Sequence, residues 1–302
     1  MLQALPSNIR LKLEQTLAQW PQWNCDPVVT RAPTIIKVLT SGVSNYSVLV
    51  ESEQHFVVRI DGIKPAKFGL CRQTEWRTLA AAHKGGLTPR PCYFNPDLGS
   101  LVCDYLAPDV SQALEAADIA RLLHKIHRLP PRHHRLNLTD RILRYEKRLK
   151  RLNRSPSSAF QQYGVAVSSM LQKISERPGE SVLCHNDLLR ANRIYSAGKL
   201  WAIDWEYCAM ASPWFDIAVI VNGDALAAPK TEILLKTYLG RAPNHWERGM
   251  LHRYSCVYRY LELLWYSALE QPILDALTVE KKAAALESML AQAVTEHTAQ
   301  MM

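Results

Sequence analysis

The most informative stretch of this chain reads His185-Asn186-Asp187-Leu188-Leu189-Arg190-Ala191-Asn192, and a second aspartate, Asp204, follows its last residue by twelve positions. An aspartate in such a loop can accept the proton of a hydroxyl group. An asparagine oxygen and a carboxylate are ligands that Mg²⁺ prefers, and Mg²⁺ usually takes only one or two ligands from protein. We therefore predict that Asp187 is a catalytic base and that Asn192 and Asp204 hold Mg²⁺.

The strands expected after this stretch give the two metal ligands a common location. Residues 193–195 and 200–203 read as the strands of a hairpin that turns at Ala197-Gly198. Asn192 then lies opposite residue 203, so Asn192 and Asp204 share the open end of the hairpin. Taken singly, these residues are common in turns. The motif, the hairpin and the second aspartate together favour a functional site.

Composition is that of an ordinary globular protein. The chain has 302 residues, enough for two lobes with their own cores, and is 48% hydrophobic and 21% charged. No apolar run approaches the ~20 residues that span a bilayer, and residues 1–20 read as an amphipathic helix, not a signal peptide. The seven cysteines form no C-x-x-C pair, which argues against a zinc site or a disulfide framework and favours the reducing cytoplasm.

The formal charge of +8 is concentrated in one segment. Residues 121–154 contain twelve Lys or Arg and two Asp or Glu, a net charge of +10, so the rest of the chain has a net charge of −2. A nucleic-acid surface is one interpretation. Aromatic residues do not alternate with the basic ones as on a stacking platform, so we favour a solvated helical face over nucleic-acid binding. Long-range attraction of ATP or an anionic partner is a third possibility.

Residues 35–60 read as antiparallel β-structure. Its turn at 40–44 could place backbone N–H groups over phosphates, although it contains a single glycine. Arg59 ends an otherwise apolar strand and therefore needs a partner, for which Glu75 on the helix expected at about 71–83 is the obvious candidate. A structural salt bridge is the alternative to a role for this pair in binding phosphate.

Buried polar residues are also expected in the second half of the chain. Asp216 lies in the apolar run 214–220, so it should form a hydrogen bond with a buried group. His124 and His127 form an H-x-x-H pair on a helix expected at 112–129. As metal ligands they would need further partners nearby, so we interpret them as ordinary helix histidines.

The motif and the following Ile203-Asp204-Trp205-Glu206-Tyr207 resemble the choline/ethanolamine kinase branch of the aminoglycoside phosphotransferase-like, protein-kinase-like superfamily. Segments 57–62 and 39–45 resemble the strand and the nucleotide loop of these kinases, with Arg59 in place of the usual lysine. The resemblance implies a two-lobed α+β fold. A small antiparallel-sheet lobe is expected over residues 1–106, and a mainly helical lobe carrying the hairpin over residues 107–302.

The resemblance also implies a reaction, in which ATP with Mg²⁺ donates its γ-phosphoryl group to the hydroxyl of a small molecule. Asp187 deprotonates the alcohol, and Arg59, supported by Glu75, binds the ATP phosphates. The other residues that the resemblance assigns are Ser41, Gly42 and Asn45 in the nucleotide loop, and His185 and Asp216 as supports of the catalytic loop. No A-P-E segment follows Asp204, which argues against a protein substrate.

Residues beside the metal ligand indicate the acceptor. Trp205, Glu206 and Tyr207 follow Asp204, and Trp265 with Tyr266 lies on a later helix. Aromatic faces attract cations by ~0.5–2 kcal/mol, so a cationic alcohol is expected. We rank choline or ethanolamine above thiamine, and thiamine above an aminoglycoside, which would need several carboxylates. Core packing of these aromatics, a sugar acceptor and a catalytically silent binding module remain alternatives. The oligomeric state is not predicted.

Overall fold

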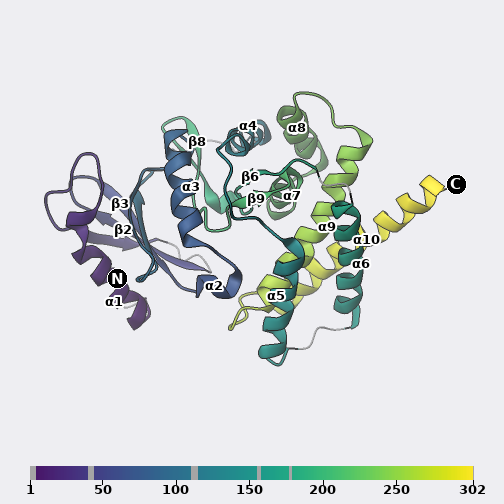
Figure 1. Ribbon diagram of the computed structural model, residues 1–302, viewed down its shortest axis with the longest axis horizontal. Coiled ribbons are helices and arrows are strands. Elements are labelled where there is room, and N and C mark those ends of the chain that lie inside the picture. The colour runs from purple at the N-terminus through teal and green to yellow at the C-terminus, as the bar shows by residue number, and fades with distance from the viewer. Residues whose placement is uncertain (1–4, 40–43, 110–114, 155–157, 177–178, 302) are drawn as a thin grey trace. The chain divides into compact units, whose positions relative to one another are not determined.

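The computed structural model describes residues 5–39, 44–109, 115–154, 158–176 and 179–301 (Figure 1). The chain divides into two compact units, Met1–Leu114 with Asn192–Cys208, and Glu115–Ala191 with Ala209–Met302. The hairpin, expected in a second lobe that began at residue 107, therefore groups with the first unit. Hydrogen bonds explain this difference. Ala202 N–H donates to the Leu87 carbonyl at 2.8 Å, and the Asp109 carboxylate accepts from two N–H groups of the hairpin turn at 2.9 and 2.8 Å.

The first unit is built on an antiparallel sheet in the order β1-β2-β3-β5-β4. Its strands are β1 (Thr34–Val38), β2 (Asn45–Glu51), β3 (His55–Asp61), β4 (Pro91–Asn95) and β5 (Ser100–Asp104). In the register of β2 and β3, Val48 pairs with Val58 and Ser47 with Arg59. The antiparallel structure expected for residues 35–60 is confirmed for the strands that the structure describes in this range, whereas residues 40–43 of the expected turn lie outside the described residues.

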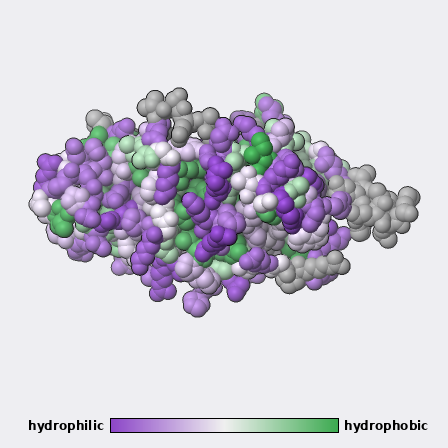
Figure 2. All heavy atoms as spheres, turned by 90° about the horizontal axis from the view of Figure 1, so that it is seen from above, coloured by the Kyte–Doolittle hydropathy of each residue, from purple (hydrophilic) through white to green (hydrophobic). Residues whose placement is uncertain are grey.

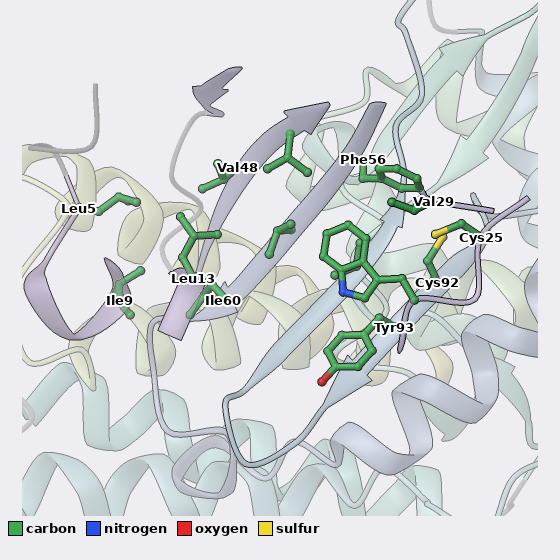
Figure 3. Packing of buried hydrophobic residues seen from close by; sticks show 14 residues of the cluster. Leu5, Ile9, Leu13, Cys25, Val29, Val48, Phe56, Ile60, Cys92 and Tyr93 are labelled. Carbon is green, nitrogen blue, oxygen red and sulfur yellow. The ribbon is translucent and has the colours of Figure 1, made fainter. Parts of the chain in front are cut away.

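The sheet has one apolar and one charged face because successive side chains of a strand point to opposite sides. Val48, Val58 and Ile60 are fully buried and pack with Ile9 and Leu13 of α1 (Ser7–Ala18), as Figure 3 shows for the residues labelled there. The opposite face of β3 faces α3 (Arg72–Lys84), and Figure 1 shows the sheet between these two helices. Short helices α2 (Pro65–Phe68) and η2 (Trp20–Gln22) complete the connections.

The hairpin has the predicted register. Its strands are β7 (Arg193–Ser196) and β8 (Lys199–Ala202), which turn at Ala197-Gly198, where both residues have positive φ angles of 52° and 68°. The N–H of Ile203 donates to the carbonyl of Asn192 at 2.9 Å. Asn192, the last residue of η3 (Arg190–Asn192), and Asp204 therefore flank the same end of the hairpin.

The second unit is mainly helical. Its helices are α4 (Ala116–His127), α5 (Leu138–Arg151), α6 (Ser158–Ser175), α7 (Pro213–Gly223), α8 (Ala228–Leu239), α9 (His245–Ser267) and α10 (Ala276–Met301), and β6 (Val182–Cys184) pairs with β9 (Ala209–Ala211). Helix α9 begins with a capping box in which Asn244 and Glu247 exchange hydrogen bonds of 2.9 and 2.7 Å.

Part of the basic segment 121–154 stabilises the end of α9. Arg148 donates to the carbonyl of Ala268 at 2.6 Å, and Arg154 donates to the carbonyl of Ser267 at 2.8 Å. Cations at a helix C-terminus satisfy its free carbonyls and interact favourably with the helix dipole. These two arginines therefore have a structural task within the second unit.

The surface is largely polar on the face shown in Figure 2, where hydrophobic residues form patches among hydrophilic ones. Among the described residues, no helix combines the length and the apolar character needed to cross a bilayer.

Candidate functional site

A buried network of charged side chains lies on the charged face of the sheet in the first unit. Arg59 is 8% exposed and pairs with Glu75 of α3, Nη1 to Oε1 at 2.6 Å and Nη2 to Oε2 at 2.8 Å. The same guanidinium reaches Asp204 at 2.6 Å. The predicted pairing of Arg59 with Glu75 is confirmed, and it extends to the carboxylate proposed as a metal ligand.

A second arginine, which the sequence did not indicate, holds the network together. Arg72 is the first residue of α3 and donates to both oxygens of Asp61 at 2.5 and 3.2 Å. It also donates to Glu75 at 2.8 Å and to Glu206 at 2.9 Å. Asn45, predicted for the nucleotide loop, lies at the start of β2, accepts from Arg72 and donates to Glu206 at 3.0 Å. Segments far apart in the sequence are thereby fixed to one another.

The network has an excess of negative charge. Its ionisable groups are the four carboxylates of Asp61, Glu75, Asp204 and Glu206 and the two guanidiniums of Arg59 and Arg72, which give a formal net charge of −2 when all six are ionised. Burial raises the pKa of Asp204 and of Glu206, and neighbouring carboxylates raise both pKa values further. Burial also disfavours the ionised form of Glu75, but the two guanidiniums lower its pKa. A divalent cation would compensate this excess.

Backbone geometry sets Asp204 apart from its neighbours. Its φ angle is +59°, in the left-handed region that aspartate tolerates better than most residues. Such conformations concentrate at functional sites. Its side chain is 29% exposed, whereas the side chain of Glu75 is 2% exposed. Of these two carboxylates, that of Asp204 is the more exposed.

The structure corrects two of the predicted acceptor contacts. Trp205 has no exposed surface, and its indole N–H donates to Thr88 Oγ1 at 3.2 Å and to the Ala202 carbonyl at 3.3 Å. Glu206 is 4% exposed and binds Arg72 and Asn45. Both side chains belong to the interior of the first unit, so neither offers a surface to an acceptor.

Tyr207 and the residues of the nucleotide loop are the remaining predictions in the first unit. Tyr207 is half-buried and stays a candidate for the acceptor site. Ser41 and Gly42 of the nucleotide loop lie outside the described residues.

In the second unit, Asp216 fixes the loop that carries Asp187. Asp216 lies in the first turn of α7 and has no exposed surface. Its carboxylate accepts hydrogen bonds from the backbone N–H groups of His185 at 2.8 Å and Asn186 at 2.9 Å. Asn186 has a positive φ of 61°. The hydrogen bonding expected for Asp216 is present. These bonds hold the catalytic loop at Asn186, where the backbone has a left-handed conformation.

His127 completes this support from α4, a contact that the sequence did not reveal. Its Nε2 lies 3.1 Å from Asp216 Oδ2, and its Nδ1 lies 2.7 Å from Tyr238 Oη. Burial opposes ionisation of Asp216, but the hydrogen bond to His127 and the one from the backbone N–H of His185 lower its pKa. Cys184 lies close enough to suggest a metal cluster with these two residues. The carboxylate, however, already accepts three hydrogen bonds, which fits support of the loop better than metal binding.

The far end of the loop packs on the end of α7. Arg190 N–H donates to Asp224 Oδ1 at 3.0 Å. At Gly223, a Cβ atom would overlap Leu189 Cδ2 and would lie 3.1 Å from Tyr258 Oη. The absence of a side chain at Gly223 therefore lets the loop and Tyr258 of α9 approach the same point.

One stripe of α9 shares the surroundings of Asp187. Tyr258, Glu262 and Tyr266 are four residues apart, a spacing that places them on one helix face. Burial raises the pKa of both tyrosines, and the negative charges of Glu262 and Asp187 raise them further. Trp265 is adjacent, with its ring 5.0 Å from that of Tyr266. Glu262 was not predicted, although the tyrosine–glutamate–tyrosine spacing was a signal for it.

Comparison with known families matches residues 35–252, more than half of the chain, to APH, the phosphotransferase enzyme family. The chain belongs to this family. It is accordingly a phosphotransferase, and the family resemblance inferred from the motif is confirmed.

Relatives of this phosphotransferase match part of its sequence. Protein LicA of Haemophilus influenzae is 30% identical over 105 residues, which cover 33% of this chain and 39% of that protein. The LicA homolog of Mycoplasma capricolum is 26% identical over 102 residues, which cover 34% of this chain and 41% of that protein. The matches thus span well under two thirds of the length of either relative.

Solved structures share its fold over most of its length. A choline/ethanolamine kinase family protein from Mesorhizobium loti has a TM-score of 0.72 at 20% identity and covers 92% of this chain and 95% of its own. Choline kinase LicA from Streptococcus pneumoniae has a TM-score of 0.73 at 22% identity, over 86% and 95%. Aminoglycoside phosphotransferase APH(2'')-Ib has a TM-score of 0.62 at 15% identity and covers 96% of this chain and 99% of its own. The predicted protein-kinase-like α+β fold is confirmed.

Proposed function

We propose that this phosphotransferase transfers the γ-phosphoryl group of ATP to the hydroxyl of a small cationic alcohol, choline or ethanolamine. The observation that carries the proposal is the α9 stripe, where Glu262 lies between two tyrosines, and the charges of both Glu262 and Asp187 raise the pKa of each tyrosine. A carboxylate beside aromatic faces suits an ammonium group. The choline and ethanolamine kinases among proteins of the same fold support this acceptor class.

Asp187 is the proposed base. In phosphoryl transfer the protein mainly positions the reactants and neutralises charge, so a carboxylate that orients the acceptor hydroxyl and takes its proton suffices. The hydrogen bonds from His185 and Asn186 to Asp216 hold the loop. His185, which is fully buried, and Asp216 are thus positioning residues.

On the nucleotide side, Asn192 and Asp204 are the proposed ligands of Mg²⁺. The net charge of −2 in the network and the exposure of Asp204 support this assignment, since a divalent cation balances that charge. Mg²⁺ would neutralise the charge on the ATP phosphates. Arg59, held by Glu75, is proposed to bind those phosphates, together with the loop residues Ser41 and Gly42. The side chain of Asn45, predicted for the same loop, is buried and bonded to Arg72 and Glu206, so it supports the network and is not proposed to contact phosphate.

On the acceptor side, the proposal now includes the α9 stripe, formed by Tyr258, Glu262 and Tyr266. Trp265 and Tyr207 are kept from the sequence prediction. Trp205 and Glu206 are dropped because their side chains are buried. Among the described residues the indole N–H of Trp265 is buried without a hydrogen-bond partner. Thiamine, also a cationic alcohol, is the second candidate. An aminoglycoside carries several amines and would need several carboxylates, whereas the stripe supplies Glu262.

A panel of acceptors tests the proposal. The purified protein with Mg-ATP would be incubated with choline, ethanolamine, thiamine, an aminoglycoside and a neutral sugar, and the phosphorylated products would be identified by ³¹P NMR. We expect the highest kcat/KM for choline or ethanolamine. A higher kcat/KM for the neutral sugar would contradict the acceptor class but would leave phosphoryl transfer intact.

A further inference from the structure

The carboxylate of the α9 stripe already binds an ammonium group that belongs to the chain itself. Lys282 of α10 places its Nζ 2.7 Å from Glu262 Oε1. The same Nζ lies 5.6 Å from the centroid of the Tyr266 ring, within the range of a cation–π contact. Figure 1 shows α10 beside α9, with which it packs. One carboxylate and one aromatic face thus hold a primary ammonium.

The ion pair between Lys282 and Glu262 is exposed enough for a ligand to displace the lysine. The side chain of Lys282 is 27% exposed and that of Glu262 is 15% exposed. A partly exposed ion pair of this kind contributes little to stability, because water competes for both charges and the long side chain loses rotamer freedom. Lysine ammonium is also strongly hydrated and lies on a flexible stem, so its return to water is favourable.

Apolar space lies next to the pair. A cavity of about 340 Å³ is lined mainly by apolar side chains, among them Tyr266, Leu263 and Val279. Val279 precedes Lys282 by three residues, so the two lie on the same face of α10. A ligand that reached Glu262 could therefore place apolar groups against Tyr266.

We propose that Lys282 is a tethered competitor for the acceptor's cationic group, which must displace its ammonium from Glu262 and Tyr266. This inference rests on the proposed function, in which Glu262 and Tyr266 receive that group. Lys282 then sets the affinity for the acceptor. A quaternary ammonium is less strongly hydrated than the lysine ammonium and is attracted to an aromatic face, so it is the cation best suited to displace Lys282.

The test uses tetramethylammonium, which carries the cationic group without a hydroxyl and so needs no turnover. Calorimetry would measure its Kd for the full chain and for three variants. Lys282→Met removes the ammonium but keeps the stem, and we expect a Kd lower by about 3- to 10-fold, the effect of removing an exposed ion pair and its cation–π contact. Lys282→Arg keeps the charge and should resemble the wild type. Lys281 is an exposed neighbour on the same helix. Lys281→Met therefore makes the same change in net charge and should leave Kd unchanged.

The outcomes separate this inference from the proposed function. An unchanged or higher Kd in a folded Lys282→Met protein would overturn the tethered competitor, even if the wild type phosphorylates choline. Equal gains in Lys282→Met and Lys281→Met would also overturn it, because they would show a general charge effect. Tighter binding in Lys282→Met alone, without phosphorylation of any cationic alcohol, would support the competitor and contradict the proposed function.

Discussion

Replacement of Arg72 by methionine tests the buried network of the first unit. Arg72 donates five hydrogen bonds, to Asp61, Glu75, Glu206 and Asn45. In Arg72→Met, Glu75 keeps Arg59, but Asp61 and Glu206 lose their guanidinium while their side chains remain 7% and 2% exposed. Removing one partner of a buried ion pair typically costs about 3–5 kcal/mol, so we expect a loss of this size in the free energy of unfolding at pH 8.

The loss should depend on pH with a definite sign. Burial raises the pKa of Asp61 and of Glu206 even with Arg72 present, and without it both pKa values rise further. As pH falls from 8 to 5, the folded variant therefore binds protons that the unfolded chain, with ordinary carboxyl pKa values, does not yet bind. Protonation removes the unpaired charges. The difference in unfolding free energy between wild type and variant should accordingly shrink as pH falls.

Urea unfolding at pH 8, 7, 6 and 5 measures this difference, and hydrogen exchange of β2 and β3 assigns it to the first unit. Arg248→Met is the matched control, because Arg248 also pairs with a carboxylate, that of Glu232 at 2.8 Å, but is 51% exposed. Its effect should be small at every pH. Equal losses in the two variants, or a loss in Arg72→Met that stays constant with pH, would refute the reasoning.

Three further variants address the catalytic residues. Asp187→Asn should retain ATP binding, measured by calorimetry, but lower kcat by ~10² or more through loss of the base, and an unchanged kcat would remove Asp187 from that role. Asp204→Ala should abolish Mg²⁺-dependent nucleotide binding in the same assay, because the phosphates would lack a held cation, and unchanged affinity would exclude Asp204 as a ligand. Asp216→Asn replaces one acceptor oxygen by a donor facing the loop, so kcat should fall by ~10-fold or more with little change in the KM for ATP, whereas a rise in that KM alone would contradict a positioning role.

Local spacing explains which features were predictable from the sequence. The hairpin register followed from the turn at Ala197-Gly198. In the structure the carbonyl of Asn192 accepts from the N–H of Ile203, the residue predicted to lie opposite it. Arg59 in an apolar strand required a partner, and Glu75 provides it. Both predictions needed only the rule that a buried charge is paired and the geometry of a two-strand turn.

Long-range contacts explain what the sequence could not show. Arg72 and Glu206 are separated by 134 positions, so nothing local indicated that they would meet. Trp205 and Glu206 were assigned to the acceptor because they follow Asp204, but Asp204 has a left-handed φ, which redirects the chain, and both side chains are buried. The spacing of Tyr258, Glu262 and Tyr266 was visible, but the sequence did not show that Tyr258 and Leu189 of the catalytic loop both lie against Gly223.

The acceptor KM of Glu262→Gln tests the central claim most directly. Glu280→Gln, an exposed glutamate on α10, is the matched control for loss of one negative charge. Because hydrogen bonds and contacts to a charged group contribute about 1.5–3 kcal/mol, we predict that Glu262→Gln raises the KM for choline by ~10-fold or more. The KM for ATP should change little, and Glu280→Gln should match the wild type. An unchanged KM for choline in a folded, active Glu262→Gln protein would contradict the claim that the α9 stripe binds the acceptor's cation.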